Sequence, residues 1–580
     1  MKNITSAVFA IIALACSAAV IASAPVDRVS ENSVDGGAPN ILLIVADDLG
    51  FSDLGAFGGE IETPNLDALA TSGIRMTNLY AAATCSPTRS MLLTGQDNHR
   101  AGIGAMAEAL RSFPMLKGRP GYEGYLKQET TTIAEVLSKS GYRTLMSGKW
   151  HLGHQPEQQP TEHGFDRAFA LLDGGADHFG AGQNGDRALQ SATYTEDGRP
   201  AEFPVGAYSS DFFTQRLIDY INDDAESDQP FFAYLAFTAP HWPLQAPTDL
   251  IAKYQGRYDA GPAALRSARL ERMKSLGLVD DSVLTSSFAV LNDWEALPES
   301  QRKIESRNME IYAAMVDSLD QNVGKVLKEL RANGDFDNTV VIFMSDNGAE
   351  GIEARSLITR TASSTPQHYK AKVLATVESA NADLSKMGTG ESFITYGSQW
   401  AQAAMAPFRK TKGDAEEGGV RVPAFISGPS IKGQRIISSA LSVRDVMPTV
   451  VDIAQASIGQ VSNSPEPVAG EIATPSGKSW QPILDGSRDS VRSDTDALAW
   501  ELHFQRGIRV GDWKAVYNKD NGDRKSPSTW KLYNLANDLA ESRDVSGENT
   551  QILERLVSAW DSYALENGVF VPGPPPPKSD

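Results

Sequence analysis

The chain has 580 residues, of which 41% are hydrophobic, and a formal net charge of −20. This length and composition can bury a large core and favour more than one domain. The acidic balance disfavours a nucleic-acid-binding protein, because it provides no basic stripe to neutralise phosphates. Beyond the N-terminal leader, no stretch approaches the roughly 20 apolar residues of a membrane-spanning helix, so we expect no transmembrane span.

The first 24 residues are typical of an export signal. Lys2 supplies a positive charge, residues 7–21 are almost wholly apolar, and Ala22-Ser23-Ala24 has the small-residue spacing of a cleavage site. We therefore expect a signal peptide at residues 1–24 and an exported mature protein, periplasmic or secreted. The sequence around Cys16 faintly resembles a lipoprotein cleavage site, which makes lipid anchoring at Cys16 the alternative.

Apolar strands alternate with helical patterns along the first three quarters of the chain. Residues 39–46 are a continuous apolar run between a proline and polar residues, which predicts a strand buried on both faces. The patterns that follow predict helices at 65–72, 132–140, 211–224, 308–332 and 443–453, and strands at 143–147, 231–237 and 339–344. This alternation predicts an α/β fold with a large, mostly parallel sheet sandwiched by helices.

The C-terminal part of the chain predicts a smaller domain. Three short strands at 497–502, 507–510 and 513–517 are separated by polar turns, which indicates an antiparallel sheet, and a helix is expected at 550–566. We therefore expect a larger domain at 25–454, an α+β domain at 455–570, and a disordered proline-rich tail at 571–580.

Three long segments carry no motif with obvious chemistry. Residues 254–305 and 353–398 are interpreted as surface helix and loop, with a substrate-lining role as the alternative. Residues 457–476 are rich in Ser, Pro and Gly and are interpreted as a linker or surface loop.

Polar residues follow four of the predicted strands, directly or within a few residues. They are Asp47-Asp48, Lys149 with His151, His241, and Asp346-Asn347. Ligands of such sheets bind beyond the carboxyl ends of the strands, so these residues are expected to share one edge. Taken singly, Asp-Asp could cap a helix and Asp-Asn could form a turn. Together, the side-chain oxygen atoms of Asp47-Asp48 and Asp346-Asn347 indicate a site for a hard divalent cation. Calcium is favoured over magnesium because it accepts more protein oxygens.

Cys85 would be the one cysteine of the processed chain, so no internal disulfide is expected. An unpaired cysteine is usually a small buried hydrophobe. Here, however, it begins Cys85-Ser86-Pro87-Thr88-Arg89, and Lys412 precedes Glu417-Gly418-Gly419 further along the chain. The CxPxR core resembles the signature of the type I sulfatases of the alkaline-phosphatase-like superfamily. The resemblance runs from about Pro39 to residues 511–514 and is closest to the bacterial arylsulfatases.

The resemblance implies a sulfuric ester hydrolase of the arylsulfatase type, which cleaves a sulfate monoester to an alcohol or phenol and inorganic sulfate. In that family a maturation enzyme oxidises the cysteine to formylglycine (3-oxoalanine), whose hydrated aldehyde is the nucleophile. The expected ligands of a single Ca²⁺ are Asp47, Asp48, the modified Cys85, Asp346 and Asn347. The expected partners are a small sulfate ester and the formylglycine-generating enzyme.

The catalytic residues are expected to be Cys85, Arg89, Lys149, His151, His241, Lys412 and Asp346. Asp346 is a candidate base for attack on sulfur, and His241 or Lys412 would protonate the departing oxygen. His151 would take a proton as sulfate is expelled. The resemblance assigns Arg89 to holding the nucleophile and Lys149 to a sulfate oxygen. With the metal, these basic side chains make a positive pocket that suits a tetrahedral oxyanion.

The other histidines do not share a strand-end position with these motifs, and we expect them to be structural or exposed. They are His99, His154, His163, His178, His368 and His503. For His503 the alternative is that its side chain approaches the site from the smaller domain. One departure from the family pattern is Asp414-Ala415-Glu416, where relatives often carry an aromatic residue.

Two other functions compete with this interpretation. A phosphoester or phosphonate hydrolase of the same superfamily usually has a Ser or Thr nucleophile and a second set of metal ligands, and neither is evident in the sequence. The other alternative is an inactive, exported protein that binds oxyanions. The intact CxPxR motif, both histidines and all three carboxylates argue against it. The sequence leaves open which sulfate ester is cleaved, whether aryl, alkyl or carbohydrate, and whether the protein oligomerises.

Overall fold

A computed structural model describes residues 37–180, 192–223, 228–282, 293–356, 367–456, 461–462, 472–473, 475–519 and 528–572. The expected signal peptide, Cys16, much of the segment 457–476 and most of the proline-rich tail lie outside these residues.

A large mixed sheet forms the centre of the fold, with the strand order β10-β2-β9-β8-β1-β7-β3-β4-β5-β6 and β11 beside β2. Its five central strands, β8, β1, β7, β3 and β4, are mutually parallel. These strands are β1 (Asn40–Ala46), β3 (Arg143–Lys149), β4 (Arg167–Leu171), β7 (Phe231–Ala236) and β8 (Thr339–Ser345). The predicted, mostly parallel sheet is confirmed.

Antiparallel strands extend the sheet on both sides. β9 (Arg421–Ser427) runs antiparallel between β8 and β2 (Ile74–Tyr80). The remaining strands are β5 (Tyr194–Glu196), β6 (Arg199–Ala201), β10 (Arg435–Ile437) and β11 (Leu441–Ser442). The sequence patterns did not predict β2 or β9, although β9 brings a distant segment next to the central strands.

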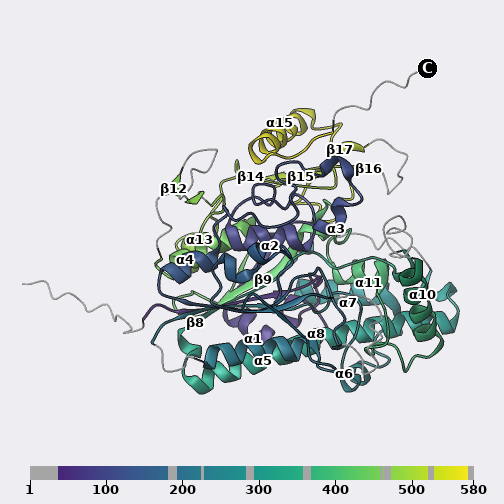
Figure 1. The fold of residues 1–580 in the computed structure, drawn as a ribbon. Helices are drawn as coiled ribbons and strands as arrows, with labels where there is room; N and C mark the ends of the chain where they lie inside the picture. The colour runs from purple at the N-terminus through teal and green to yellow at the C-terminus, as the bar shows by residue number, and fades with distance from the viewer. Residues whose placement is uncertain are drawn as a thin grey trace, which may run out of the picture. The chain divides into compact units, whose positions relative to one another are not determined.

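Helices cover both faces of the sheet (Figure 1). One face carries α1 (Pro64–Ser72), α5 (Ser209–Asn222) and α8 (Glu299–Asn333), and the other carries α2 (Cys85–Thr94), α4 (Ile133–Lys139) and α13 (Val446–Ile453). Along β1, Leu42 and Ile44 pack into one core cluster while Leu43 and Val45 pack into the other. A strand buried on both faces needs apolar residues at every position, which explains the continuous apolar run.

The segments without obvious chemistry are largely helical. Residues 254–305 and 353–398 contribute α7 (Gly261–Ser275), the first turns of α8 and α10 (Gln367–Ala382). The helices α6 (Thr248–Lys253) and α11 (Gly397–Ala404) flank them. The predicted helix at 308–332 therefore begins earlier, at Glu299. The short elements β12 (Val461–Ser462), β13 (Ile472–Ala473) and α14 (Gln481–Leu484) follow α13.

A second, antiparallel sheet lies in the C-terminal part of the chain. It consists of β14 (Ala497–Leu502), β15 (Gln505–Val510), β16 (Trp513–Lys519) and β17 (Ser528–Asn534), followed by α15 (Thr550–Asn567). The predicted antiparallel sheet is confirmed, with β17 as an additional strand. Trp560 of α15 packs against one face of the sheet, and Trp500 on the other face packs against Tyr80 of the large sheet. Residues from Ala38 onward form one compact unit. The domain boundary expected near residue 454 therefore stays a prediction.

Among the helices of the described residues, none combines the length and the apolar character needed to cross a bilayer.

Candidate active site

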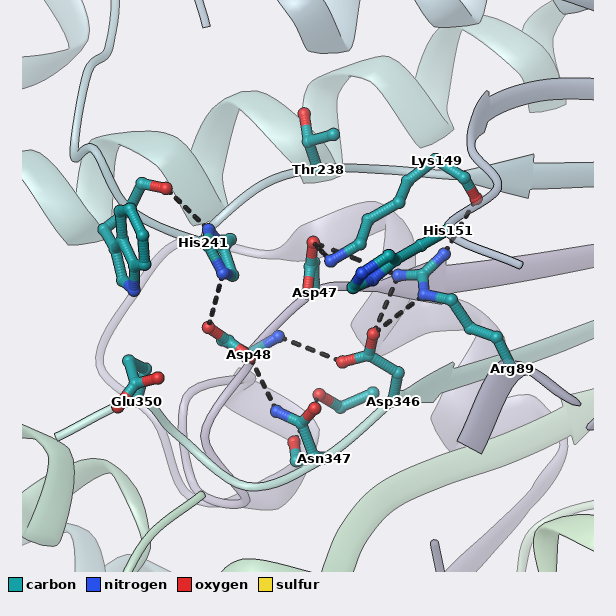
Figure 2. A network of polar contacts seen from close by, with 12 residues as sticks. Asp47, Asp48, Arg89, Lys149, His151, Thr238, His241, Asp346, Asn347 and Glu350 are labelled. Atoms are coloured by element: carbon teal, nitrogen blue, oxygen red, sulfur yellow. Dashed lines mark hydrogen bonds and ion pairs between the residues drawn. The ribbon is translucent and has the colours of Figure 1, made fainter. Parts of the chain in front are cut away.

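Four neighbouring strands bring polar residues to one edge of the large sheet. β8, β1, β7 and β3 are adjacent and parallel, so their carboxyl ends point the same way. Asp346 and Asn347 follow β8, Asp47 and Asp48 follow β1, His241 follows β7, and Lys149 ends β3. Figure 2 shows these side chains in one polar network. The structure thus brings together the residues that the sequence placed at strand ends.

Three carboxylates and Cys85 form the centre of this network. One ligand atom from each of Asp47, Asp48, Cys85 and Asp346 lies within 4.8 Å of every other, and all four residues are buried. The backbone of Asp48 has a φ of 67°, in the left-handed region, and its N–H donates to Asp346 Oδ1 at 3.3 Å. Asn347 Nδ2 donates to Asp48 Oδ1 at 2.6 Å. These contacts tie the turns after β1 and β8 to each other.

Cys85 is the first residue of α2, and its side chain is buried. Burial raises the pKa of the Cys85 thiol well above its ordinary value, although the nearby ammonium groups of Lys149 and Lys412 act to lower it. The unmodified residue is therefore a neutral thiol.

Three basic side chains surround the carboxylates. Arg89 Nε and Nη2 donate to Asp346 Oδ2 at 3.0 and 2.8 Å. Lys149 Nζ lies 2.6 Å from Asp47 Oδ2, and Lys412 Nζ lies 2.8 Å from Asp48 Oδ1. Burial alone would raise the pKa values of both aspartates, but Lys149 and Lys412 hold them below their ordinary range. Asp47 and Asp48 are therefore ionised.

The two predicted catalytic histidines lie on different sides of this network. His241 Nδ1 contacts the carbonyl oxygen of Trp242 at 2.5 Å, and its Nε2 lies 3.6 Å from Asp48 Oδ2. Burial lowers the pKa of His241 to about 4. His151 has a φ of 55°, and its Nε2 lies 3.1 Å from Glu108 Oε1.

The oxygen atoms at this edge fit a hard cation. Asp47 Oδ1 and Asn347 Oδ1 are both buried and have no hydrogen-bond partner among the described residues. A buried oxygen without a donor is costly unless a cation or another group compensates it. Carboxylate and amide oxygens are the ligands that calcium and magnesium prefer, so this donor set is suited to such an ion.

A family comparison agrees with this geometry. The family model described as Sulfatase matches residues 39–456, a span that includes every site residue named above. The chain belongs to the sulfatase family. The prediction made from the CxPxR motif is therefore confirmed, and the sulfatase hydrolyses sulfate esters.

Curated relatives support the same assignment. An uncharacterized sulfatase of Schizosaccharomyces pombe is 42% identical over 546 residues, covering 92% of this chain and 94% of the relative. An arylsulfatase of Klebsiella aerogenes is 38% identical over 419 residues, covering 72% of this chain and 86% of the relative.

Solved structures show the same fold. The structure of Ps i-CgsB in complex with k-i-k-neocarrahexaose has a TM-score of 0.61 and 24% identity, covering 92% of this chain and 94% of that one. A phosphonate monoester hydrolase of Agrobacterium radiobacter has a TM-score of 0.53 and 19% identity, covering 92% of this chain and 96% of that one. The fold of the sulfatase is alkaline-phosphatase-like.

Sequence reasoning missed a layer of residues behind the metal-binding turn. Gly50 N–H donates to Asp53 Oδ2 at 2.7 Å, and Tyr312 of α8 donates to the same oxygen at 2.6 Å. Arg269 of α7 is fully buried and donates to Asp53 Oδ1 at 2.5 Å. The interpretation of residues 254–305 as surface helix and loop does not hold for this face of α7. No local pattern indicates an ion pair between residues so far apart.

Two further carboxylates adjoin the predicted catalytic residues. Glu108 contacts His151, and Glu350 Oε2 lies 3.5 Å from Lys412 Nζ. Glu350 follows Asp346 by four positions, so its proximity to the turn after β8 could have suggested it. Glu108 lies on the short helix α3 (Ala107–Leu110), which is far along the sequence from every predicted strand end.

The other histidines of the chain differ in their exposure. His99, His163 and His178 are buried, whereas His154 is partly exposed. The ring of His503 stacks on Phe113, with 4.5 Å between the ring centroids. The side chain of His368 lies outside the described residues.

The loop with the unusual Asp414-Ala415-Glu416 sequence packs against the C-terminal sheet. Trp500 Nε1 of β14 donates to the carbonyl oxygen of Ala415 at 3.2 Å. An aromatic side chain from the second sheet therefore lies against the loop.

Proposed function

We propose that this sulfatase is a formylglycine-dependent hydrolase of aryl sulfates that binds one Ca²⁺. The observation that carries the proposal is the position of Cys85 at the start of α2. Its Sγ lies within 4.8 Å of oxygens from Asp47, Asp48 and Asp346. A group formed at position 85 would therefore meet the cation and the basic side chains at once.

Asp47, Asp48, Asp346, Asn347 and the modified residue 85 would hold the ion. Bound calcium would compensate the buried carboxylates and act as a Lewis acid toward oxygen atoms held against it. The hydrated aldehyde of formylglycine would supply a hydroxyl nucleophile at the place of the neutral thiol.

The chain's own residues supply binding and proton transfer. Lys149 and Lys412 would bind oxygens of the sulfate group, because their ammonium groups lie against Asp47 and Asp48 at the centre of the site. Arg89 would hold Asp346, the candidate base for attack on sulfur, through its two hydrogen bonds. His241 and Lys412 both lie beside Asp48, and Lys412 would give a proton to the departing oxygen, because the lowered pKa of about 4 leaves the His241 ring neutral.

The preference for an aryl leaving group rests on the resemblance of this chain to the arylsulfatases. The name of the Klebsiella relative, an arylsulfatase, supports the same substrate class.

We further propose that the sulfatase is exported, to the periplasm or outside the cell, after cleavage of the signal peptide at residues 1–24. N-terminal sequencing of the protein recovered from the periplasm or medium tests this proposal. A mature N-terminus at Cys16 would instead support lipid anchoring.

The test of the function combines peptide mass spectrometry with a substrate panel, on protein co-expressed with a formylglycine-generating enzyme. We expect the peptide containing Cys85 to show the mass loss of thiol-to-aldehyde conversion. We expect calcium-loaded protein to hydrolyse 4-nitrophenyl sulfate faster than an alkyl sulfate, a sugar sulfate, 4-nitrophenyl phosphate or a phenylphosphonate ester. A Cys85→Ala variant should be inactive. Full activity of protein with an unmodified thiol, or faster cleavage of the phosphorus esters, would overturn the proposal.

A further inference from the structure

Glu108 contacts His151 from a segment that carries none of the sulfatase motifs. Glu108 Oε1 and Oε2 lie 3.1 and 3.3 Å from His151 Nε2. The glutamate side chain is half exposed, whereas only 5% of the His151 side chain is exposed. The carboxylate thus approaches the ring from its solvent side.

The ring of His151 is also confined on another side. Gly174 lies just after β4, and a Cβ atom built on it would be 2.7 Å from His151 Cε1. Only a residue without a side chain leaves room for the ring there. Glu108 and Gly174 together therefore define where the ring can lie.

The contact with Glu108 decides which ring nitrogen carries the hydrogen. A carboxylate accepts hydrogen bonds, so neutral His151 has its hydrogen on Nε2 and an unprotonated Nδ1. Nδ1 is buried and has no hydrogen-bond partner among the described residues. The nitrogen able to accept a proton is therefore the one that Glu108 leaves free.

We propose that Glu108 is a positioning residue for His151, which holds the Nε2–H tautomer and makes Nδ1 the proton acceptor when sulfate is released. In this step an O–H bond at position 85 breaks and an N–H bond forms at Nδ1. The electron pair of the O–H bond forms the C=O bond of the regenerated aldehyde, while the C–O bond to sulfate breaks and its electron pair leaves with the sulfate. The carboxylate stabilises the resulting imidazolium, which returns its proton to water. A carboxylate acts in the same way on the histidine of a Ser-His-Asp triad. The inference rests on the proposed function, because that function assigns His151 to the release of sulfate.

The first test measures the tautomer and needs neither modification, metal nor turnover. Protein labelled with ¹⁵N-histidine is compared by NMR between wild type and Glu108→Ala, and a His151→Ala variant assigns the signal. We expect the Nε2–H form of His151 in the wild type and a mixture of tautomers in Glu108→Ala. A wild-type His151 with its hydrogen on Nδ1 would overturn the proposal.

The second test separates the two halves of the reaction. In modified, calcium-loaded Glu108→Gln we expect kcat for 4-nitrophenyl sulfate to fall on the order of 100-fold. The value of kcat/KM should fall far less, because it reports the steps up to release of the phenol. A burst of one equivalent of phenol before the steady state is expected in this variant. On a His151→Ala background, Glu108→Gln should have no further effect.

Glu129→Gln is the matched control, since Glu129 is an exposed carboxylate and has no assigned role. It should leave kcat and kcat/KM at the wild-type values. An equal fall of kcat and kcat/KM in Glu108→Gln, or an unchanged kcat, would overturn the proposal. Failure of the proposed function has a different result: modified wild-type protein would then not hydrolyse the sulfate ester at all.

Discussion

His178 holds the loop that carries His241. Its Nε2 donates to the carbonyl oxygen of His241 at 2.9 Å, and its Nδ1 accepts a hydrogen bond from Ser209 Oγ at 2.8 Å. The ring is buried, and burial lowers the pKa of His178 to about 4. A neutral ring keeps one donor and one acceptor, which is what these two contacts require.

We expect His178→Phe to destabilise the sulfatase without opening a cavity. The variant retains an aromatic ring but leaves the Ser209 hydroxyl and the His241 carbonyl without their partner. Each unsatisfied buried group costs roughly 1–3 kcal/mol, so the free energy of unfolding should fall by about 2–4 kcal/mol in urea denaturation. His154→Gln, at a partly exposed histidine, is the control and should change it by less than about 0.5 kcal/mol. Equal stability of the two variants would contradict this role.

At the scale of elements, the C-terminal sheet supports the loop of Lys412. Gly413 follows Lys412 in the chain. Its carbonyl oxygen accepts a hydrogen bond from Gln505 Nε2 of β15 at 2.7 Å. Lys514 of β16 is fully buried between two carboxylates, 2.8 Å from Glu417 and 2.9 Å from Glu541. The second sheet therefore belongs to the architecture of the active site, although it carries none of the predicted catalytic residues.

We expect Lys514→Met to lower both stability and activity, because it removes the cation between two buried carboxylates and, among the described residues, leaves only Glu417 with another ion-pair partner, Arg421. Removing one partner of a buried ion pair costs about 3–5 kcal/mol. Chemical denaturation and steady-state kinetics measure the two effects. Adding Glu541→Gln should recover part of the stability, since it removes one of the uncompensated charges. Lys478→Met is the control, because its pair with Asp496 is substantially exposed and should contribute less than about 1 kcal/mol. A loss below 1 kcal/mol in Lys514→Met would refute this account.

At the scale of the whole molecule, His99 connects the segment after α2 to the C-terminal sheet. Its Nδ1 lies 2.9 Å from Asp97 and its Nε2 lies 3.1 Å from Glu501 of β14. Burial alone would lower the pKa of His99, but the hydrogen bonds and charges of the two carboxylates raise it to about 9. The buried ring is therefore a cation at neutral pH and joins the two sheets through ion pairs.

This raised pKa predicts a loss of stability at alkaline pH. The folded pKa lies above the ordinary value of 6.5, so the stabilisation is complete below pH 6.5 and is lost as pH rises through 9. The contribution of His99 to the free energy of unfolding should fall by up to about 3 kcal/mol across this range. Urea titrations at several pH values measure it. In His99→Gln this alkaline decline should be much weaker, and an identical decline in both proteins would contradict the prediction.

Calcium should stabilise the whole molecule, because only the folded chain brings the turns after β1 and β8 together. A ligand at 100 times its Kd adds about 2.7 kcal/mol to the free energy of unfolding. We therefore expect the Tm to fall on chelation and to recover with calcium more than with magnesium. Asp47→Asn should lose most of this response, whereas Glu129→Gln should keep it. A Tm that ignores calcium would argue against the metal assignment.

The amino-acid sequence by itself determined four of the five central parallel strands, all except β4, and the strand-end position of most site residues. Residues 41–46 and 340–344 are apolar throughout because a strand between two helical layers is buried on both faces. Parallel strands end at a common edge, so Asp47 and Asp346 could be placed together without coordinates. Cys85 and Arg89 belong to a local motif, which is readable within five residues.

Only the tertiary structure decided which distant side chains meet. Arg269 binds Asp53, Glu108 binds His151, Lys514 binds Glu417, and His99 binds Glu501. β9 enters the sheet antiparallel beside β8 and brings the loop of Lys412 with it. Strand and helix periodicity records which face of an element is buried, and the sequence therefore predicts layers well. The partner of each charge in these ion pairs depends on packing between segments that lie 43 to 402 residues apart in the sequence, and no local pattern encodes that choice.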